Sequence, residues 1–196
     1  MHISMKADIR QATKKLRGAQ KKQIPFATAQ ALTQTARDVA KEEKRQMPMK
    51  LDRPTKFSQN AFGVKKATKL RLVSTVFIKP IQAAYLGWQI RGGTRSPKSR
   101  AIAVPVNVKL NRFGNMKRHQ IAALLSDPDN FSGKVNGHAG IWHRREDGGL
   151  DMLVAWEPRA SYRKRFPFHK IGRGKANATF KRNMKRSLDR ALRSAK

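Results

Sequence analysis

An extreme positive charge constrains this chain more than any other feature of its sequence. The 196 residues contain 44 Lys and Arg against 12 Asp and Glu, a formal net charge of +32, and residues 53–126 include no acidic residue at all. A compact fold that concentrates so much like charge repels itself unless counterions or a polyanion screen the charge. We therefore expect the folded protein to work against phosphate groups or an acidic partner.

Length and composition predict one domain with appendages and a modest core. A chain of 196 residues falls in the usual size range of one domain, roughly 100 to 200 residues. Hydrophobic residues make up 39%, below the roughly 45–50% of typical domains, so oligomerisation would add useful buried surface. The absence of cysteine excludes disulfides, thiolate metal sites and thiol nucleophiles. Because no run resembles a secretory signal or a membrane span, we expect a cytoplasmic protein without a membrane partner.

Helical periodicity is clearest near the start of the chain, where we predict an N-terminal helical segment over residues 1–48. Apolar residues recur at three- and four-residue spacing over residues 9–21 and again over residues 26–45, and Met47-Pro48 is expected to end the second helix. The stripe of the second helix is mostly alanine, which allows a neighbouring backbone to approach closely. This stripe consists of Ala29, Leu32, Ala36, Val39 and Ala40.

Residues 49–196 are predicted to form an α+β domain around a small, mostly antiparallel central sheet. Alternating residues predict a strand over residues 70–79, and an apolar run predicts a short strand over residues 101–108. Residues 140–145 and 150–156 flank a glycine-containing turn and predict a hairpin. The remaining predictions are loops at residues 51–69 and 127–140 and a short helix over residues 116–125.

A basic C-terminal helix completes the predicted fold. Residues 159–196 contain 14 Lys and Arg against Asp189 alone. We interpret the glycine-containing segment 172–175 as a flexible joint before this helix rather than as a phosphate cradle. Apolar residues at four-residue spacing predict one buried seam on the helix. The seam consists of Phe180, Met184, Leu188 and Leu192.

Catalytic chemistry has little support in the sequence. The acidic pairs Glu42-Glu43 and Glu146-Asp147 are expected on a helix surface and in a turn, and the acid-free middle cannot supply clustered carboxylates for a metal-dependent hydrolase. His138 and His143 lack the ligand spacing of a metal site. We therefore predict no enzyme activity, no metal and no cofactor.

Clustered basic residues predict contact with nucleic acid or another polyanion. Such groups contact phosphates without reading bases, and neutralising about six phosphates makes binding steeply dependent on salt. Aromatic residues among these charges, in segments 142–145 and 162–166, are more readily explained as core anchors than as base-stacking platforms. The predicted contact residues are Arg91, Arg95, Lys98, Arg100, Lys117, Arg118, Arg163, Lys164, Arg165, Lys181, Arg182, Lys185 and Arg186.

Three short motifs occur in a recognisable order. Ala84-Tyr85-Leu86 follows the predicted strand and leads into Gly92-Gly93-Thr94, and a later Tyr162-Arg163-Lys164-Arg165-Phe166-Pro167-Phe168 segment precedes the basic helix. This order resembles the small neck and tail-completion proteins of tailed bacteriophages, and minor tail protein Z is a looser likeness. The residues that carry the likeness as a loop or interface are Tyr85, Gly92, Gly93, Thr94, Phe166 and Phe168.

The resemblance implies a structural role in the virion, with host cytoplasm as the site of assembly. It implies a homo-oligomer, as a ring or as several copies, that contacts portal, adaptor or tail proteins at the head–tail junction. It brings no enzyme activity. Near a conduit filled with double-stranded DNA, the basic excess would offset phosphate repulsion without sequence preference.

Two other classes of protein remain open from the sequence. A non-specific nucleic-acid-binding protein of ribosomal or nucleoid type would share the small size, the high charge and the absence of cysteine. An assembly factor or nuclease is the third alternative, and it would need a metal-dependent activity that the scarce carboxylates do not favour.

Overall fold

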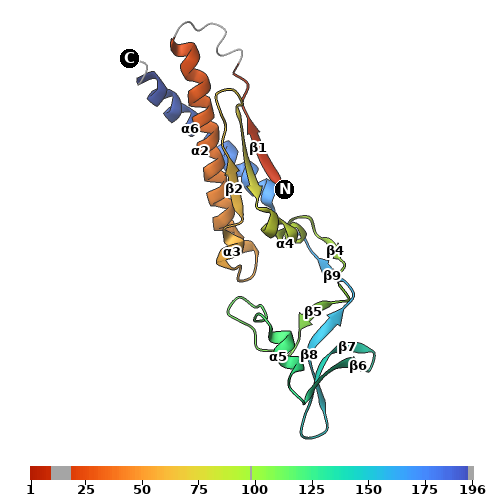
Figure 1. The fold of residues 1–196 in the computed structure, drawn as a ribbon. Coiled ribbons are helices and arrows are strands. Elements are labelled where there is room, and N and C mark those ends of the chain that lie inside the picture. Colours follow the sequence, from red (N-terminus) through yellow and green to blue (C-terminus); the bar gives the residue numbers. More distant parts are fainter. Residues whose placement is uncertain (10–18, 98, 194–196) are drawn as a thin grey trace. The chain divides into compact units, whose positions relative to one another are not determined.

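The computed structural model describes residues 1–9, 19–97 and 99–193 (Figure 1). The fold is α+β, as predicted, and its described strands form three antiparallel sheets rather than one central sheet. The chain divides into a larger unit, Met1–Ile90 with Lys164–Lys196, and a smaller unit, Arg91–Arg163. The predicted domain boundary at residue 48 does not separate these units, because the helix on its N-terminal side packs against the C-terminal helix.

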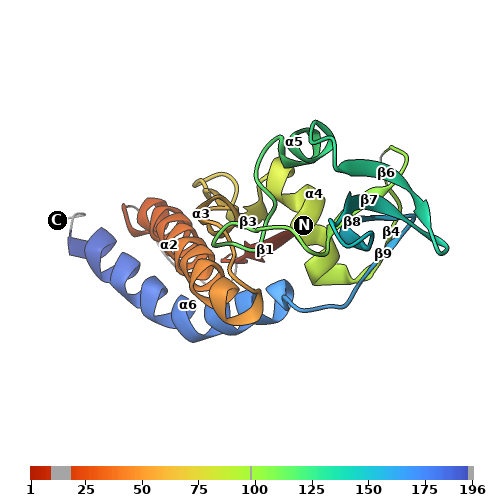
Figure 2. The same ribbon diagram turned by 90° about the horizontal axis from the view of Figure 1, so that it is seen from below.

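Helix α2 (Ala19–Lys50) and helix α6 (Phe168–Arg193) lie side by side in the larger unit (Figures 1 and 2). The alanine-rich stripe predicted for α2 is confirmed: four of its five residues are buried, and only Ala40 is half-buried. The helix is longer than predicted, because Pro48 sits in the last turn and does not end it. Most of the helix predicted at residues 9–21 lies outside the described residues, and α2 begins where that prediction ends.

The predicted seam of α6 is wrong. Its residues Phe180, Met184 and Leu188 are half-buried, and Leu192 is 48% exposed. The buried side of the helix is shifted by one position towards small and polar residues, and Asn183 there donates a hydrogen bond to Thr35 of α2 (3.0 Å). Small side chains face α2 because the two helices pack too closely for large ones. The buried residues are Phe168, Gly172, Thr179, Asn183, Ser187 and Ala191.

Gly172 lies inside α6, so the segment predicted to be a flexible joint is helical. A Cβ atom at this position would lie 2.1 Å from Ile3 Cδ1, 3.1 Å from Glu43 Oε1 and 3.3 Å from Val39 Cγ1. Glycine is therefore used here for close approach between α6, α2 and the first strand. At Gly174, by contrast, a Cβ atom would meet nothing within 4 Å.

Replacing Gly172 with leucine is expected to lower the free energy of unfolding by about 1 to 3 kcal/mol, because the added side chain overfills a packed site. The control Gly174→Ala is expected to raise that free energy by up to about 1 kcal/mol, since alanine favours the helix and finds open space. Urea denaturation followed by circular dichroism measures both. A Gly172→Leu variant as stable as the parent would contradict the close packing.

A three-stranded sheet packs against the helix pair in the larger unit. Its order is β1 (His2–Lys6), β3 (Val73–Ile78) and β2 (Phe62–Lys65), with both pairings antiparallel. The strand predicted over residues 70–79 is confirmed as β3. Strand β2 contradicts the predicted loop at residues 51–69. Strand β1 contradicts the start of the helical segment predicted over residues 1–48.

The main hydrophobic core lies where this sheet meets the ends of the helices. Phe168 is the first residue of α6, and Phe166 lies just before it; they are 0% and 1% exposed. The centre of the Phe62 ring in β2 lies 6.2 Å from the Phe166 ring centre and 6.1 Å from the Phe168 ring centre. The short helix α3 (Lys56–Gln59) precedes β2, and helix α4 (Pro80–Arg91) follows β3. Besides the two phenylalanines, the buried members of the cluster are Met47, Ala61, Ile78 and Leu86.

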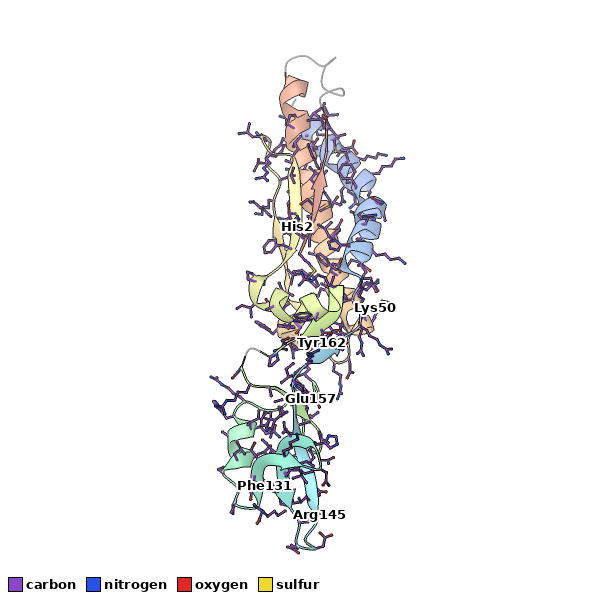
Figure 3. The ribbon with its side chains drawn as sticks, turned by 90° about the vertical axis from the view of Figure 1, so that its right-hand side faces the viewer. His2, Lys50, Phe131, Arg145, Glu157 and Tyr162 are labelled. Atoms are coloured by element: carbon purple, nitrogen blue, oxygen red, sulfur yellow. The ribbon has the colours of Figure 1, made fainter. Side chains whose placement is uncertain are left out.

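The smaller unit contains the other two sheets. The predicted hairpin is confirmed as β7 (His138–Arg144) and β8 (Leu150–Glu157), and Figure 3 labels Arg145 at its turn. The predicted short strand is confirmed as β5 (Ile102–Pro105), while β6 (Asn130–Val135) replaces the predicted loop at residues 127–140. The sheet order is β5-β8-β7-β6. The unit is completed by α5 (Gln120–Leu125), which is shorter than the predicted helix, and by the pair β4 (Gly93–Arg95) and β9 (Ala160–Tyr162).

Candidate nucleic-acid interface

The structure distributes the predicted contact residues over both units. All of those described are exposed except Arg95, which is half-buried, and Lys98 lies outside the described residues. The smaller unit carries Arg91, Arg95, Arg100, Lys117, Arg118 and Arg163, and the larger unit carries Lys164, Arg165, Lys181, Arg182, Lys185 and Arg186.

Most of the net charge belongs to the larger unit. By sequence it contains 31 Lys and Arg against 6 Asp and Glu, so it contributes a net charge of +25 out of +32. The smaller unit contains 13 against 6. A polyanion site is therefore expected first on the larger unit.

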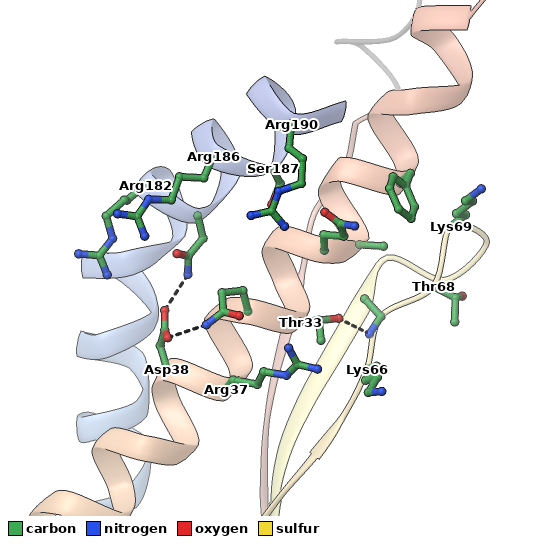
Figure 4. Close-up of a pocket in the computed structure, with 16 residues that line it drawn as sticks. Thr33, Arg37, Asp38, Lys66, Thr68, Lys69, Arg182, Arg186, Ser187 and Arg190 are labelled. Carbon is green, nitrogen blue, oxygen red and sulfur yellow. Dashed lines mark hydrogen bonds between the residues drawn. The ribbon is translucent and has the colours of Figure 1, made fainter. Parts of the chain in front are cut away.

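A cleft of about 770 Å³ opens on the larger unit between α2, α6 and the loop at residues 66–69 that connects β2 to β3 (Figure 4). We call it the basic cleft, because six of its lining residues are cationic and one is acidic. The acidic residue is Asp38. The six cations are Arg37, Lys66, Lys69, Arg182, Arg186 and Arg190.

Helical spacing places three of these cations in one row. Arg182, Arg186 and Arg190 follow one another at four-residue intervals on α6, so they lie on one face of the helix. The row lies beside the buried residues Asn183 and Ser187, and the arginines therefore emerge at the edge of the α2–α6 contact. Figure 4 shows Arg182, Arg186 and Arg190 along this wall of the cleft.

The opposite side of the cleft is formed by α2 and by the loop that follows β2. The backbone N–H of Ala67 donates to the Thr33 hydroxyl of α2 (3.1 Å), which fixes the loop against the helix. Thr68 and Arg71 close the loop through reciprocal bonds of 2.9 and 3.0 Å. Lys69 is held with its ammonium 5.1 Å from the centre of the Phe26 ring, a cation–π contact.

Asp38 is used to join the two helices rather than to neutralise the arginines. Its two oxygens accept hydrogen bonds from Gln34 (3.0 Å) and Asn183 (2.8 Å). Both donors are neutral amides, and no ion pair with a carboxylate is formed by any of the six cations within the described part of the chain. The cleft therefore keeps its positive charge available to an anion.

Sequence reasoning identified Arg182 and Arg186 but missed the other four cations of the cleft. Arg190 continues the same four-residue spacing and could have been added from the sequence. Arg37, Lys66 and Lys69 could not, because only the tertiary fold brings α2 and the loop to face α6. Lys181 and Lys185, which were predicted, are exposed on α6 but do not line the cleft.

The residues singled out by the phage resemblance do not form one surface. Phe166 and Phe168 are buried in the core, so they are structural and are not available to a partner. Tyr85 is 38% exposed on α4, and its hydroxyl bonds to the Ser58 hydroxyl (2.9 Å). Of the remaining three motif residues, Gly92 links α4 to β4, and Gly93 and Thr94 begin β4. Positive φ angles of 71° and 111° favour glycine at positions 92 and 93.

In the described parts of the chain, the acidic and histidine residues form no group of three or more that could hold a metal ion. His143 bonds through Nδ1 to Asn130 on the neighbouring strand (2.9 Å). Glu42 accepts from Gln46 (2.8 Å) and from Arg45, and these bonds lower its pKa to about 2. Glu43, predicted on the helix surface, is instead fully buried, and burial raises its pKa to about 8.

Neither carboxylate oxygen of Glu43 makes a hydrogen bond of normal geometry. The nearby backbone N–H of Gly172 favours the charged form, but this effect is smaller than the cost of burial. The side chain is enclosed between α2 and α6, so it has no access to a substrate. We assign it to the stability of the fold.

None of the helices in the described residues has the length and apolar character that a membrane crossing requires. Comparisons of the chain with protein-family models, with curated proteins and with solved structures find no match.

Proposed function

We propose that this chain is a structural subunit of a tailed bacteriophage, located at the neck or tail-completion junction between head and tail. In this role it assembles in several copies, contacts portal, adaptor or tail proteins, and offsets the phosphate charge of the genome. The motif order described above supports the phage assignment. The observation that carries the electrostatic part is the basic cleft, in which six cations gather on a unit of net charge +25 and form no ion pair with a carboxylate among the described residues.

The proposed mechanism is electrostatic and needs no catalytic group. When the cations of the cleft neutralise phosphates, counterions condensed on the DNA are released, so the contact is favourable, independent of sequence and weakened by salt. Many separate charge contacts exchange readily, which would retain the DNA end and still permit its ejection. A few bidentate contacts to base edges would make binding depend on the DNA sequence. Sequence preference has no use in a conduit through which the DNA passes.

Quantitative mass spectrometry of purified tailed particles tests the phage assignment. We expect the chain in intact particles at a fixed copy number, well below that of the capsid protein and consistent with a ring or a small set of copies. Its absence from particles that are otherwise complete would refute the assignment. Co-purification with host ribosomes or nucleoid in cells that make no virion proteins would favour the alternative of a general nucleic-acid-binding protein.

A further inference from the structure

We infer that the basic cleft binds one sugar–phosphate strand of a DNA duplex lengthwise, without reading its bases. The inference rests on the proposed function for the identity of the polyanion. It goes further in assigning the contact to one cleft rather than to the diffuse charge of the whole chain.

The row of arginines on α6 matches a linear array of phosphates. At a rise of 1.5 Å per residue, the eight steps from Arg182 to Arg190 extend over about 12 Å of helix. Each strand of B-DNA presents one phosphate for about every 3.4 Å of helix axis, so the row is long enough to face several phosphates in succession. Guanidinium groups bind phosphate oxygens in a bidentate manner, and four of the six cations of the cleft are arginines.

Cations on the other side of the cleft make it a channel rather than a flat patch. Arg37 projects from α2, and Lys66 and Lys69 come from the loop held by Thr33 (Figure 4). A volume of about 770 Å³ is typical of a pocket that encloses a small molecule. It therefore has room for a few sugar–phosphate units of one strand and not for a whole duplex, whose bases and second strand would remain outside.

The lining favours nucleic acid over an acidic protein segment. Of the 16 lining residues, three are apolar: Phe26, Ala29 and Ala67. Protein–protein interfaces have an apolar centre, whereas protein–DNA interfaces are more polar and much more positive. Phe26 remains 36% exposed, but the Lys69 ammonium lies 5.1 Å from the centre of its ring, so a cation already occupies one face of this apolar side chain.

Base reading is disfavoured by the way the amide side chains of the cleft are used. Asparagine and glutamine amides are the groups that recognise adenine edges. Two of the three amides in the lining, Gln34 and Asn183, donate to Asp38 instead. The cleft is thus equipped to hold a backbone and not to select a sequence.

Fluorescence anisotropy with a labelled 20-base-pair duplex tests the assignment with two matched double variants of the full chain. Arg182→Gln with Arg186→Gln removes two charges from the cleft, and Lys181→Gln with Lys185→Gln removes two from the same helix outside it. The cleft pair is expected to weaken binding about 10- to 100-fold near 0.1 M salt and to reduce the slope of log affinity against log salt by about 2. The control pair is expected to change affinity less than about threefold.

A third variant is expected to act in the opposite direction. Asp38→Asn removes the one acidic group of the cleft while its side-chain carbonyl can still accept from Asn183. Affinity for the duplex is expected to rise about three- to tenfold because a like charge beside the phosphates is lost. If the arginine variant fails to fold by circular dichroism, Lys66→Gln with Lys69→Gln tests the opposite wall, with the same expected change in slope.

Competition against the labelled duplex distinguishes a nucleic-acid occupant of the basic cleft from an acidic protein segment. Inorganic polyphosphate, a linear phosphate array without bases, is expected to displace the duplex, and polyglutamate of equal charge is expected to do so poorly.

Equal losses of affinity in the cleft and control variants would overturn the cleft assignment and leave the proposed virion role standing. Stronger displacement by polyglutamate would replace DNA with an acidic protein. No binding of duplex by the parent chain at low salt would overturn the inference, and the mass spectrometry of particles would still decide the proposed function.

Discussion

Replacing Glu43 with glutamine is expected to make the protein markedly more stable at pH 9 while leaving its stability almost unchanged at pH 4.5. Glu43 is fully buried between α2 and α6, with Oε1 facing Gly172. Burial, with a smaller contribution from the adjacent Glu42 carboxylate, raises its pKa from 4.5 to about 8. Glutamine has nearly the same shape and remains neutral at every pH, so it removes the titration without removing the side chain.

The direction in which the unfolding free energy changes with pH follows from proton binding to Glu43. Between pH 4.5 and about pH 8 the folded protein retains a proton on Glu43 that the unfolded chain releases. The stability associated with this group is therefore fully present below pH 4.5 and is lost as pH rises through about 8. The rise of the Glu43 pKa from 4.5 to about 8 corresponds to a loss of roughly 5 kcal/mol of unfolding free energy between those two pH values. This is comparable with the whole stability of a small domain.

Urea denaturation of the parent and of Glu43→Gln between pH 4.5 and pH 9 measures the effect. The difference in unfolding free energy between the two proteins should grow with pH and level off above pH 8, while contributions from other groups cancel. The neighbouring Glu42→Gln is the matched control with the opposite sign, because the pKa of Glu42 is lowered to about 2 by its bonds to Arg45 and Gln46. It should destabilise the protein at neutral pH. A pH-independent difference for Glu43→Gln would show that the carboxyl is not buried.

Local sequence patterns predicted the elements whose periodicity is complete within one segment. The alanine-rich face of α2, strand β3, the β7–β8 hairpin and the C-terminal helix α6 all belong to this group. Strand β2 was missed because its four residues show no clear alternation and are held by pairing with β3. Strand β1 does alternate polar and apolar residues over His2–Lys6, but five residues alone do not show that a partner strand exists. His2 pairs with Phe77, for example, and no local rule connects residues so far apart.

The error in the α6 seam has a different physical cause. The four-residue periodicity of α6 is correct, but its largest apolar residues are not its most buried ones. Where two helices pack closely, glycine, serine and threonine occupy the contact and residues such as Met184 are displaced to its edge. The same close contact buries Glu43, which no reading of charge along the sequence would place in the interior.

The candidate site was predictable only in part for a related reason. A row such as Arg182 and Arg186 is visible from the spacing of one helix. The cleft also requires Arg37 and the loop carrying Lys66 and Lys69, and these are brought opposite that row by packing. The sequence therefore predicted contact with a polyanion, whereas the proposal of one face of α6 over the other depends on the fold.

Phe168→Ala is expected to lower the free energy of unfolding by about 3 to 5 kcal/mol, because it removes a fully buried aromatic side chain and leaves a cavity. Phe168 stands at the first position of α6, and its ring stacks with Phe62 of β2 at a centroid distance of 6.1 Å and an interplanar angle of 8°. The side chain thus fixes the start of the helix to the sheet. Its loss should weaken the docking of the first turn of α6 against the sheet.

Urea denaturation compares this variant with Phe57→Ala, a phenylalanine that is 55% exposed and is expected to matter little, with a change below about 1 kcal/mol. Under conditions where Phe168→Ala remains mostly folded, its affinity for DNA should fall only by the fraction of molecules that are unfolded. A variant that is fully stable but loses partner binding would instead show that Phe168 is an interface residue, as the sequence resemblance had implied. The burial of the ring at 0% exposure makes the first result the expected one.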